Sequence, residues 1–446
     1  MDIEERLKLL KKSRDLRQRT RRDSVETTWA RLGKDQNLSE KEKLEKLIHL
    51  TVAKKSKPDT ERPPFEPLPR EPMKLVENSY PLPSRYGKNR IGDGLAIRGE
   101  ILYYLSKDES FKDLDLSTAL FIDLETTGLA GGTGTLPFLV GMGYFRNGKF
   151  NIAQYFLGEP ADEGRMIEEL AAFFKEMDFQ SVVTYNGKAF DLPLLETRFV
   201  LNRKPFVLSD LPHLDLLFSA RSLWKHKHES CRLCHLAQEI VEAERAEDIP
   251  SSEIPYIYST YLRGGNFSLI EPIIYHNQED LLSLLGLTIA AAKLFVEDRE
   301  ETEEFDALDM IGVGKVFESA GDLEKSVERF ERALKGELPD EISLTIKAKL
   351  SIHYKRNADY EKAVTLWQDI SSRHENPLEA LRELAMYFEH KQKDYEEAKR
   401  TAEEGLALAM NGSASIRGKD FRKDFEHRLD RLNDKIIRHS KGRKAG

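Results

Sequence analysis

The chain has 446 residues, of which 40% are hydrophobic and 33% charged, and its formal net charge at pH 7 is −8. This length predicts two or three domains, and the negative charge disfavours a surface that is basic all over, although local basic patches can still bind nucleic acid. Two cysteines exclude a disulfide framework, and no apolar run approaches the roughly 20 residues of a membrane-spanning helix. With no secretory signal at Met1–Glu5, the sequence predicts a cytoplasmic protein that does not bind membranes.

Two segments precede the predicted folded domains. Residues 1–57 are highly charged and partly helical in pattern, with basic residues gathered between Lys8 and Arg22. Such a run is more often a solvated helix or tail than a nucleic-acid arm. Residues 58–79 are rich in proline and predict an extended linker, so we expect the folded enzyme to begin near Tyr80.

Residues 80–300 carry the pattern of an α/β domain. Hydrophobic runs predict strands at 119–124, 138–145, 149–157 and 181–185, and Asn147-Gly148 predicts a hairpin turn between the second and third. Apolar spacing predicts helices at 166–177, 192–201 and 277–296. Three consecutive strands, a helix and a further strand describe a mixed sheet flanked by helices. This order resembles the start of the ribonuclease H-like fold.

Residues 305–440 predict an all-α domain made of repeats. Segments beginning at Ala320, Asn357 and Lys393 each contain a short turn followed by a helix with an apolar stripe. Their spacing of about 35 residues is close to the tetratricopeptide period. The segments therefore resemble tetratricopeptide helix pairs, with an ordinary helical bundle as the alternative.

Acidic residues gather at three separate places in the α/β segment. Asp123 and Glu125 alternate on a predicted strand and so share a face, and Asp191 opens a predicted helix. His276 and Asp280 are four residues apart and lie on one face of another helix. Crowded carboxylates require cations, and their oxygens suit Mg²⁺ or Mn²⁺, which indicates phosphoryl chemistry on a nucleic acid. A single one of these carboxylates could instead be a strand-end residue bonded to a loop.

The order of these segments and the residues in them resemble the motifs of the DEDD superfamily of 3′→5′ exonucleases. The wider stretches 229–233, 247–250, 253–255 and 275–280 are similar to the bacterial YprB-like family. That family combines this nuclease domain with tetratricopeptide repeats, and one member is a mitomycin repair exonuclease. The resemblance extends from about Tyr80 into the repeats.

The resemblance implies a role for each residue of the acidic set. Asp123, Glu125, Asp191 and Asp280 would hold two Mg²⁺ or Mn²⁺ ions, and His276 would be the general base. The histidine subclass places its base five residues before the last aspartate and the tyrosine subclass four. This chain has Tyr275 at the first spacing and His276 at the second. His276 is favoured because imidazole titrates near neutral pH, and the choice between the two stays open.

Other polar motifs are weaker. Gly131–Gly134 lacks the lysine of a P-loop and predicts a tight connection. His226, His228 and the stretch 231–235 have zinc-like spacing without a full second ligand pair. Asp215 and Thr126 could serve the site or support the backbone. Side chains that could contact phosphate, or simply be surface charges, are Arg198, Lys204, Arg221, Lys225 and Lys227.

The sequence thus predicts a metal-dependent 3′→5′ exonuclease acting on DNA in repair. One alternative is an RNA-processing exonuclease with the same site, because a protein can read the 2′-hydroxyl. Another is a tetratricopeptide scaffold that carries an inactive nuclease domain. The repeats would bind a protein partner or shape the path of the substrate, and family context suggests a DEAD/DEAH-type helicase as the partner.

Overall fold

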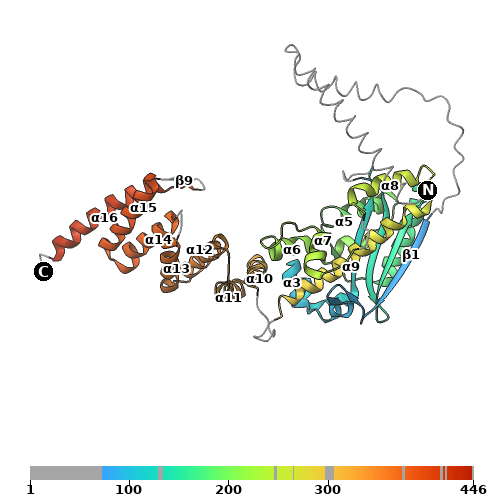
Figure 1. Cartoon of the computed structure of the whole chain (residues 1–446), viewed down its shortest axis with the longest axis horizontal. Coiled ribbons are helices and arrows are strands. Elements are labelled where there is room, and N and C mark those ends of the chain that lie inside the picture. Colours follow the sequence, from blue (N-terminus) through green and yellow to red (C-terminus); the bar gives the residue numbers. More distant parts are fainter. Residues whose placement is uncertain are drawn as a thin grey trace, which may run out of the picture. The chain divides into compact units, whose positions relative to one another are not determined.

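The computed structural model describes residues 73–128, 134–245, 249–264, 266–296, 306–373, 377–411, 415–416 and 419–443. The charged extension predicted at 1–57, most of the predicted linker and residues 131–133 of the glycine motif lie outside the described residues. Figure 1 shows a twisted sheet with helices, followed in the chain by a series of helices. Among the described residues, no helix is both long and apolar enough to cross a bilayer.

The first part of the described chain is built on a six-stranded sheet with the order β1-β6-β5-β4-β7-β8. The first four strands in this order are antiparallel neighbours, whereas β7 and β8 run parallel to β4. This arrangement confirms the predicted mixed sheet. The strands are β1 (Met73–Pro81), β4 (Ala119–Thr126), β5 (Pro137–Arg146), β6 (Lys149–Leu157), β7 (Ser181–Thr184) and β8 (His213–Asp215).

The hairpin between β5 and β6 forms where the sequence predicted it. Asn147 and Gly148 have φ angles of 54° and 70°, and Arg146 pairs with Lys149 across the turn. Two consecutive positive φ angles are what a two-residue hairpin loop requires, and Asn-Gly provides them at low cost. The local turn chemistry therefore fixes the register of both strands.

The predicted linker extended to residue 79, and here the structure corrects the prediction. Met73–Pro81 forms strand β1 and pairs with β6 along its whole length, with Met73 opposite Leu157. The strand is at the sheet edge, and its inward positions include polar Asn78 beside Val76 and Tyr80. An edge strand with a weakly apolar face gives little hydrophobic alternation, and the surrounding prolines obscure it further.

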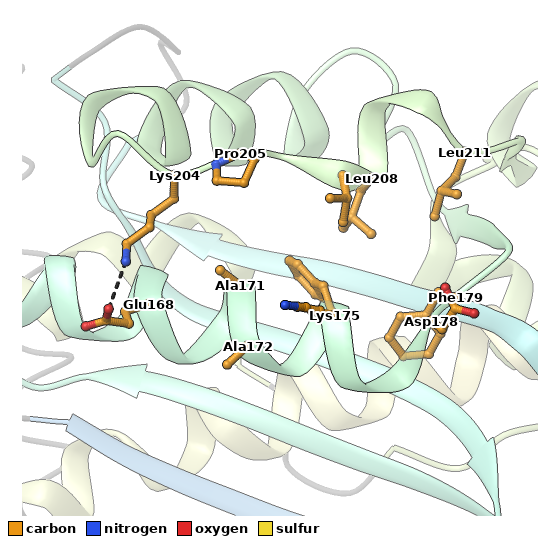
Figure 2. Close-up of a pocket in the computed structure, with 12 residues that line it drawn as sticks. Glu168, Ala171, Ala172, Lys175, Asp178, Phe179, Lys204, Pro205, Leu208 and Leu211 are labelled. Atoms are coloured by element: carbon orange, nitrogen blue, oxygen red, sulfur yellow. Dashed lines mark hydrogen bonds and ion pairs between the residues drawn. The ribbon is translucent and has the colours of Figure 1, made fainter.

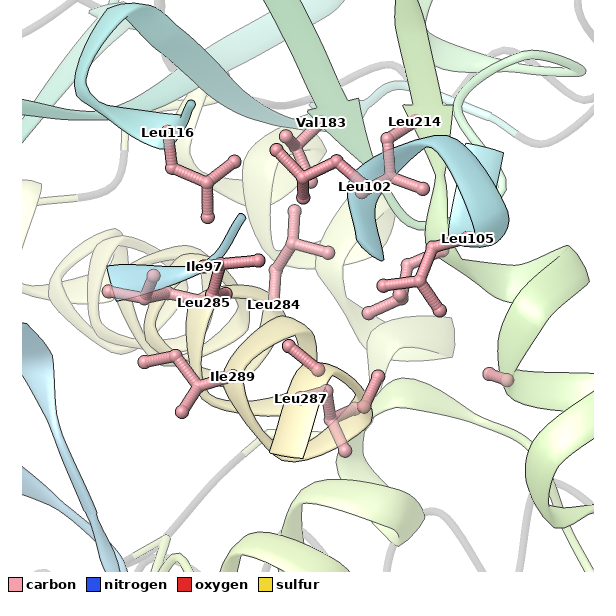
Figure 3. Packing of buried hydrophobic residues seen from close by; sticks show 14 of the residues in the cluster. Ile97, Leu102, Leu105, Leu116, Val183, Leu214, Leu284, Leu285, Leu287 and Ile289 are labelled. Carbon is pink, nitrogen blue, oxygen red and sulfur yellow. The ribbon is translucent and has the colours of Figure 1, made fainter. Parts of the chain in front are cut away.

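Helices pack on both faces of the sheet. On β4, Ala119 and Phe121 belong to a core with α3, α6 and α9, whereas Leu120 and Ile122 belong to a second core with α4, α5 and α8. Figure 3 shows Leu284 and neighbouring α9 side chains packed among residues of α3, β7 and β8. The residues labelled there from these three elements are Leu102, Leu105, Val183 and Leu214. The helices are α3 (Gly99–Ser106), α4 (Glu163–Met177), α5 (Asp191–Leu201), α6 (Leu216–Trp224), α7 (Leu233–Leu236), α8 (Ile254–Tyr261) and α9 (Glu271–Lys293).

The C-terminal part is helical, as predicted, apart from a two-stranded hairpin at Ser415–Ile416 and Lys419–Asp420. Neighbouring helices in the chain pack against one another. The helices are α10 (Ala307–Ser319), α11 (Leu323–Ala333), α12 (Asp340–Arg356), α13 (Tyr360–Arg373), α14 (Leu378–Tyr387), α15 (Tyr395–Asn411) and α16 (Phe421–Arg443).

The three turns singled out in the sequence share one backbone design. Gly321, Ala358 and Lys393 have positive φ angles of 86°, 60° and 58°, which end the preceding helix. An aspartate follows each of them and accepts a hydrogen bond from a backbone N–H three residues later, which caps the next helix. The capping bonds are Lys325 N–H to Asp322, Lys362 N–H to Asp359 and Glu397 N–H to Asp394. The repeat is therefore structural as well as sequential, although its tetratricopeptide identity stays a prediction.

Candidate active site

The acidic end of β4 faces helix α9. Phe121 packs in the core beneath α9, and side chains two residues apart on a strand share a face, so Asp123 and Glu125 point the same way. β7 pairs with β4 only as far as Phe121. The backbone N–H of Leu124, beyond that point, bonds to the carboxylate of Asp191. The early end of β7 thus lets the start of α5 approach β4.

Asp191 is positioned by the loop between β7 and α5. Asn186 in this loop has a φ of 70°, which asparagine tolerates better than most residues. The buried carboxylate of Asp215 holds the loop by accepting hydrogen bonds from the N–H groups of Asn186 at 2.7 Å and Lys188 at 3.0 Å. It also accepts from Leu217 N–H at 3.2 Å at the start of α6. Asp215 therefore supports the loop that carries Asp191, one of the two roles left open by the sequence.

Replacing Asp215 by alanine should leave these three N–H groups, of which that of Leu217 is buried, without their acceptor. We expect a loss of about 1–3 kcal/mol in the free energy of unfolding. Urea unfolding followed by circular dichroism measures this, and limited proteolysis reports on the loop. Asp215→Asn, which keeps one carbonyl acceptor, should lie between the wild type and Asp215→Ala. Equal stability of all three proteins would show that the loop is held by other contacts.

Helix α9 brings His276 and Asp280 to the carboxylates of β4. His276 Nε2 lies 3.5 Å from Asp280 Oδ2 and 3.8 Å from Glu125 Oε1. Tyr275, the other candidate base, acts on Tyr80: burial, followed by Glu279 and Tyr275, raises the pKa of Tyr80 to about 12. The structure thus places His276 beside two of the predicted ligands, and the choice between His276 and Tyr275 stays a prediction.

The other three carboxylates lie close enough to Asp123 to raise its proton affinity. Burial, followed by repulsion from Asp280, Glu125 and Asp191, raises the pKa of Asp123 well above its usual range, against a hydrogen bond from Asn277. Burial raises the pKa of Asp191 to about 7, although backbone N–H groups partly offset it. All four predicted ligands therefore contribute to one electrostatic cluster that favours a positive charge among them.

This donor set suits a hard divalent cation by its chemistry, because Mg²⁺ and Mn²⁺ prefer carboxylate oxygens. Nevertheless, in the part of the chain that the structure describes, no three His, Cys, Asp or Glu side chains form a group that could hold a metal ion. Two of the carboxylates are turned to other partners: Asp123 Oδ2 accepts from Asn277 Nδ2 at 2.8 Å, and Asp280 Oδ1 from Arg245 Nη2 at 2.6 Å. The predicted ligands are neighbours without forming a finished coordination shell.

Asn277 belongs to a buried polar chain that the sequence did not reveal. Its Nδ2 also lies 3.2 Å from the backbone oxygen of Asp123, and its Oδ1 accepts from Gln154 Nε2 at 2.8 Å. Gly141 on β5 leaves the necessary space, because a Cβ there would lie 2.0 Å from Asn277 Oδ1. A glutamine in an otherwise apolar strand, Gln154, is the one feature of the sequence that indicates a buried polar contact. Only the fold shows that its partner is Asn277.

Gly141→Ala should therefore cost about 1–3 kcal/mol of stability, because the new methyl group displaces Asn277 from Asp123. Chemical denaturation monitored by circular dichroism measures the loss. Gly164→Ala on α4 is the matched control, since its Cβ would meet Asn202 Oδ1 at 3.4 Å, an ordinary contact. If Gly141→Ala were as stable as the control, Asn277 could leave its place without cost.

Arg245 is a second residue that the sequence analysis missed. It follows a turn with Glu242 at a φ of 59°, and its side chain is 5% exposed. In the sequence it lies within the charged run Glu242–Asp248, which has the composition of a solvated surface. Nothing in this run predicts that the guanidinium is buried against Asp280.

Several weaker candidates have structural partners. Lys227 pairs with Asp306 and Asp309, and Arg198 with Glu163, so these two cations are already engaged by carboxylates. Thr126 Oγ1 donates to the backbone oxygen of Gly128, one of its two predicted roles. For the zinc-like motif, the His228 and His235 rings are 6.3 Å apart, and the described residues contain no three-ligand group there.

Lys204 is also paired with a carboxylate, at the edge of a cavity. Figure 2 shows its ammonium bonded to Glu168 between α4 and the segment 204–211. The cavity there has a volume of about 530 Å³. The lining includes apolar Ala171, Leu208 and Leu211. None of the predicted site residues lines this cavity.

Residues 120–292 match the family model of the RNase H superfamily, a range that contains all five predicted site residues. The chain is also 32% identical over 342 residues to the uncharacterized protein YprB of Bacillus subtilis (strain 168). This match covers 75% of the chain and 80% of that relative. The chain belongs to the YprB family. Its RNase H superfamily domain indicates a nuclease, and therefore a nucleic-acid substrate.

Among solved structures, the chain is similar to the family B DNA polymerase from the hyperthermophilic archaeon Pyrobaculum calidifontis. The TM-score is 0.32 and the sequence identity is 17%, and the match covers 48% of this chain. It spans only 28% of the polymerase chain. A likeness this distant says nothing about activity.

Proposed function

We propose that this YprB-family chain is a metal-dependent 3′→5′ exonuclease that hydrolyses phosphodiester bonds of DNA in repair. The main support is the convergence of four carboxylates from β4, α5 and α9 in an RNase H superfamily domain. Three segments that are far apart in the sequence meet there, and the charges of Asp280, Glu125 and Asp191 raise the pKa of Asp123. A scaffold without catalytic function would gain no stability from burying mutually repelling carboxylates.

Each residue has a role in this proposal. Asp123, Glu125, Asp191 and Asp280 would hold two Mg²⁺ or Mn²⁺ ions, which supply charge neutralisation at the phosphate and a water of lowered pKa. His276, beside Glu125 and Asp280, would accept the proton of the attacking water at Nε2. The buried Asn277 would hold the Asp123 carboxylate in place through its hydrogen bond to Oδ2.

The remaining parts of the chain have proposed roles as well. Residues 1–57 and the linker form an extension, the nuclease domain runs from β1 to about residue 300, and residues 305–440 form tetratricopeptide-like repeats. The shared turn and aspartate cap support the repeat assignment. The repeats would bind a protein partner, for which the family resemblance suggests a DEAD/DEAH-type helicase. Both cysteines are free thiols, in keeping with a cytoplasmic location.

A nuclease assay tests the proposal. The full chain is incubated with 5′-labelled and 3′-labelled strands of DNA and RNA, with Mg²⁺, Mn²⁺ or EDTA. We expect metal-dependent shortening of 5′-labelled DNA in single-nucleotide steps, and loss of this activity in Asp191→Asn. Asp210→Asn, an exposed aspartate at the end of the 3₁₀ turn before β8, is the matched control. Faster cleavage of RNA would favour the RNA-processing alternative, and equal activity of Asp191→Asn and wild type would reject the site.

A further inference from the structure

A buried cation is already present among the predicted metal ligands. The guanidinium of Arg245 is 5% exposed, and its Nη2 donates to Asp280 Oδ1 at 2.6 Å. The same nitrogen lies 2.6 Å from Ser283 Oγ and 3.1 Å from the backbone oxygen of Glu279. Three acceptors from two turns of α9 therefore converge on one nitrogen. Such convergence of acceptors holds the guanidinium in one position.

The surroundings of Arg245 are themselves fixed. Tyr86 OH lies 2.8 Å from Ser283 Oγ and donates to Glu279 Oε2 at 2.9 Å, which orients the acceptors. Tyr86 belongs to a small antiparallel pair of strands, β2 (Arg85–Tyr86) and β3 (Asn89–Arg90). The turn that leads to Arg245 is fastened to this pair, because Lys88 N–H donates to the backbone oxygen of Val241 at 2.8 Å. A desolvated arginine that left this place without another partner would lose its charge compensation, so the ion pair should persist.

The position of Arg245 on Asp280 determines how its charge affects metal binding. Asp280 offers one oxygen to Arg245 and the other to His276, so the carboxylate that would hold a metal ion is already engaged on both sides. Arg245 cannot be deprotonated in a protein, and its charge repels any divalent ion bound to Asp280. With four ionised carboxylates, Arg245 and one divalent ion leave a net charge of −1, and a second divalent ion would turn it to +1 before any phosphate is bound.

We infer that Arg245 is a resident counter-charge that stands in for the second divalent ion of the proposed site until a substrate phosphate binds, so that the substrate-free site binds a single ion. The inference rests on the proposed function, since it concerns the metal site of the proposed nuclease. Arg245 is a positioning residue in this scheme. It holds Asp280 and weakens metal binding on its side of the cluster, leaving Asp123, Glu125 and Asp191 as the ligands of the retained ion.

Counting bound Mn²⁺ by electron paramagnetic resonance of the free ion tests this with the full chain. We expect one ion per wild-type chain, lost in Asp123→Ala, and a second ion or at least about tenfold tighter binding in Arg245→Met. Arg245→Lys keeps the charge and should bind one ion as the wild type does. Arg165→Met removes an exposed arginine of α4 and controls for net charge. If Arg245→Met fails to fold by circular dichroism, Arg245→Gln replaces it, because its amide can still donate to Ser283.

Two results would overturn the inference while leaving the proposed function intact. One is wild-type binding of two ions of similar affinity that Asp123→Ala abolishes. The other is Asp123-dependent binding that stays unchanged or weakens in both Arg245→Met and Arg245→Gln. If no variant and no wild-type sample binds Mn²⁺, the metal site itself is absent, and both the proposed function and the inference fail.

Discussion

Asp123→Asn is expected to abolish the proposed nuclease activity and, in the same protein, to raise the melting temperature measured in EDTA. Asp123 lies at the centre of the acidic cluster, where burial and repulsion from Asp280, Glu125 and Asp191 destabilise its ionised form. Asparagine has nearly the same shape and still offers an oxygen to Asn277 Nδ2, so the backbone and its neighbours need not move. The substitution therefore removes a charge without creating a cavity.

The two effects have different sizes. Loss of an electrostatic contact that acts on the transition state costs about 10²–10³-fold in rate, and loss of a metal ligand should reach at least this range. Relief of about 1 kcal/mol of repulsion would raise the melting temperature by roughly 2–4 °C. Steady-state cleavage of labelled DNA and differential scanning calorimetry in EDTA measure the two quantities.

Asp210→Asn is the control, because this carboxylate is exposed and should leave both quantities unchanged. Retained activity in Asp123→Asn would contradict a ligand role for Asp123. Lost activity together with a lower melting temperature would show that Asp123 stabilises the fold, in which case the cluster is not under electrostatic strain.

The sequence predicts the framework around the site well because local chemistry determines it. The hairpin between β5 and β6 follows from Asn147-Gly148, and the shared face of Asp123 and Glu125 follows from strand periodicity. His276 and Asp280 share a face because helices bring residues four apart together. These features depend on a few neighbouring residues, and the structure reproduces their geometry.

What the sequence could not predict depends on pairs of residues far apart in the chain. Gln154 and Asn277 are 123 positions apart, and neither has a local pattern that reveals the other. Arg245 has the sequence environment of a surface residue, and only the closeness of Asp280 gives it a buried partner. Strand β1 was missed for a related reason, since an edge strand owes its order to β6 more than to its own hydrophobicity.

Glu389→Ala is expected to release helix α16 from the other C-terminal helices. The Glu389 carboxylate is fully buried in the π-helical turn Phe388–Gln392 and accepts from three cations of α16: Arg428 at 2.8 Å, Arg431 at 2.7 Å and Lys435 at 2.9 Å. Removing one partner of a buried ion pair leaves the other charge uncompensated, at a cost of about 3–5 kcal/mol. Arg428, 7% exposed, should carry most of this cost.

The pH dependence gives this prediction a second readout. Burial alone would raise the pKa of Glu389, but hydrogen bonds from Arg431 and Lys435 outweigh it and lower the pKa from 4.5 to about 2. A lowered folded-state pKa stabilises the fold above pH 4.5, and this contribution is lost as the pH falls toward 2. The stability gap between wild type and Glu389→Ala should therefore narrow below pH 4.5.

Hydrogen exchange of α16 amides and chemical denaturation at several pH values measure the loss and its pH dependence. Glu403→Ala on α15 is the control, because its pair with Lys399 is exposed and worth only about 0.3–0.5 kcal/mol. Slow exchange of α16 in Glu389→Ala would mean that the apolar contacts of Phe421, Phe425 and Leu432 hold the helix by themselves. Fast exchange confined to α16 would instead show that one buried carboxylate, surrounded by arginine and lysine, joins the last helix to those before it.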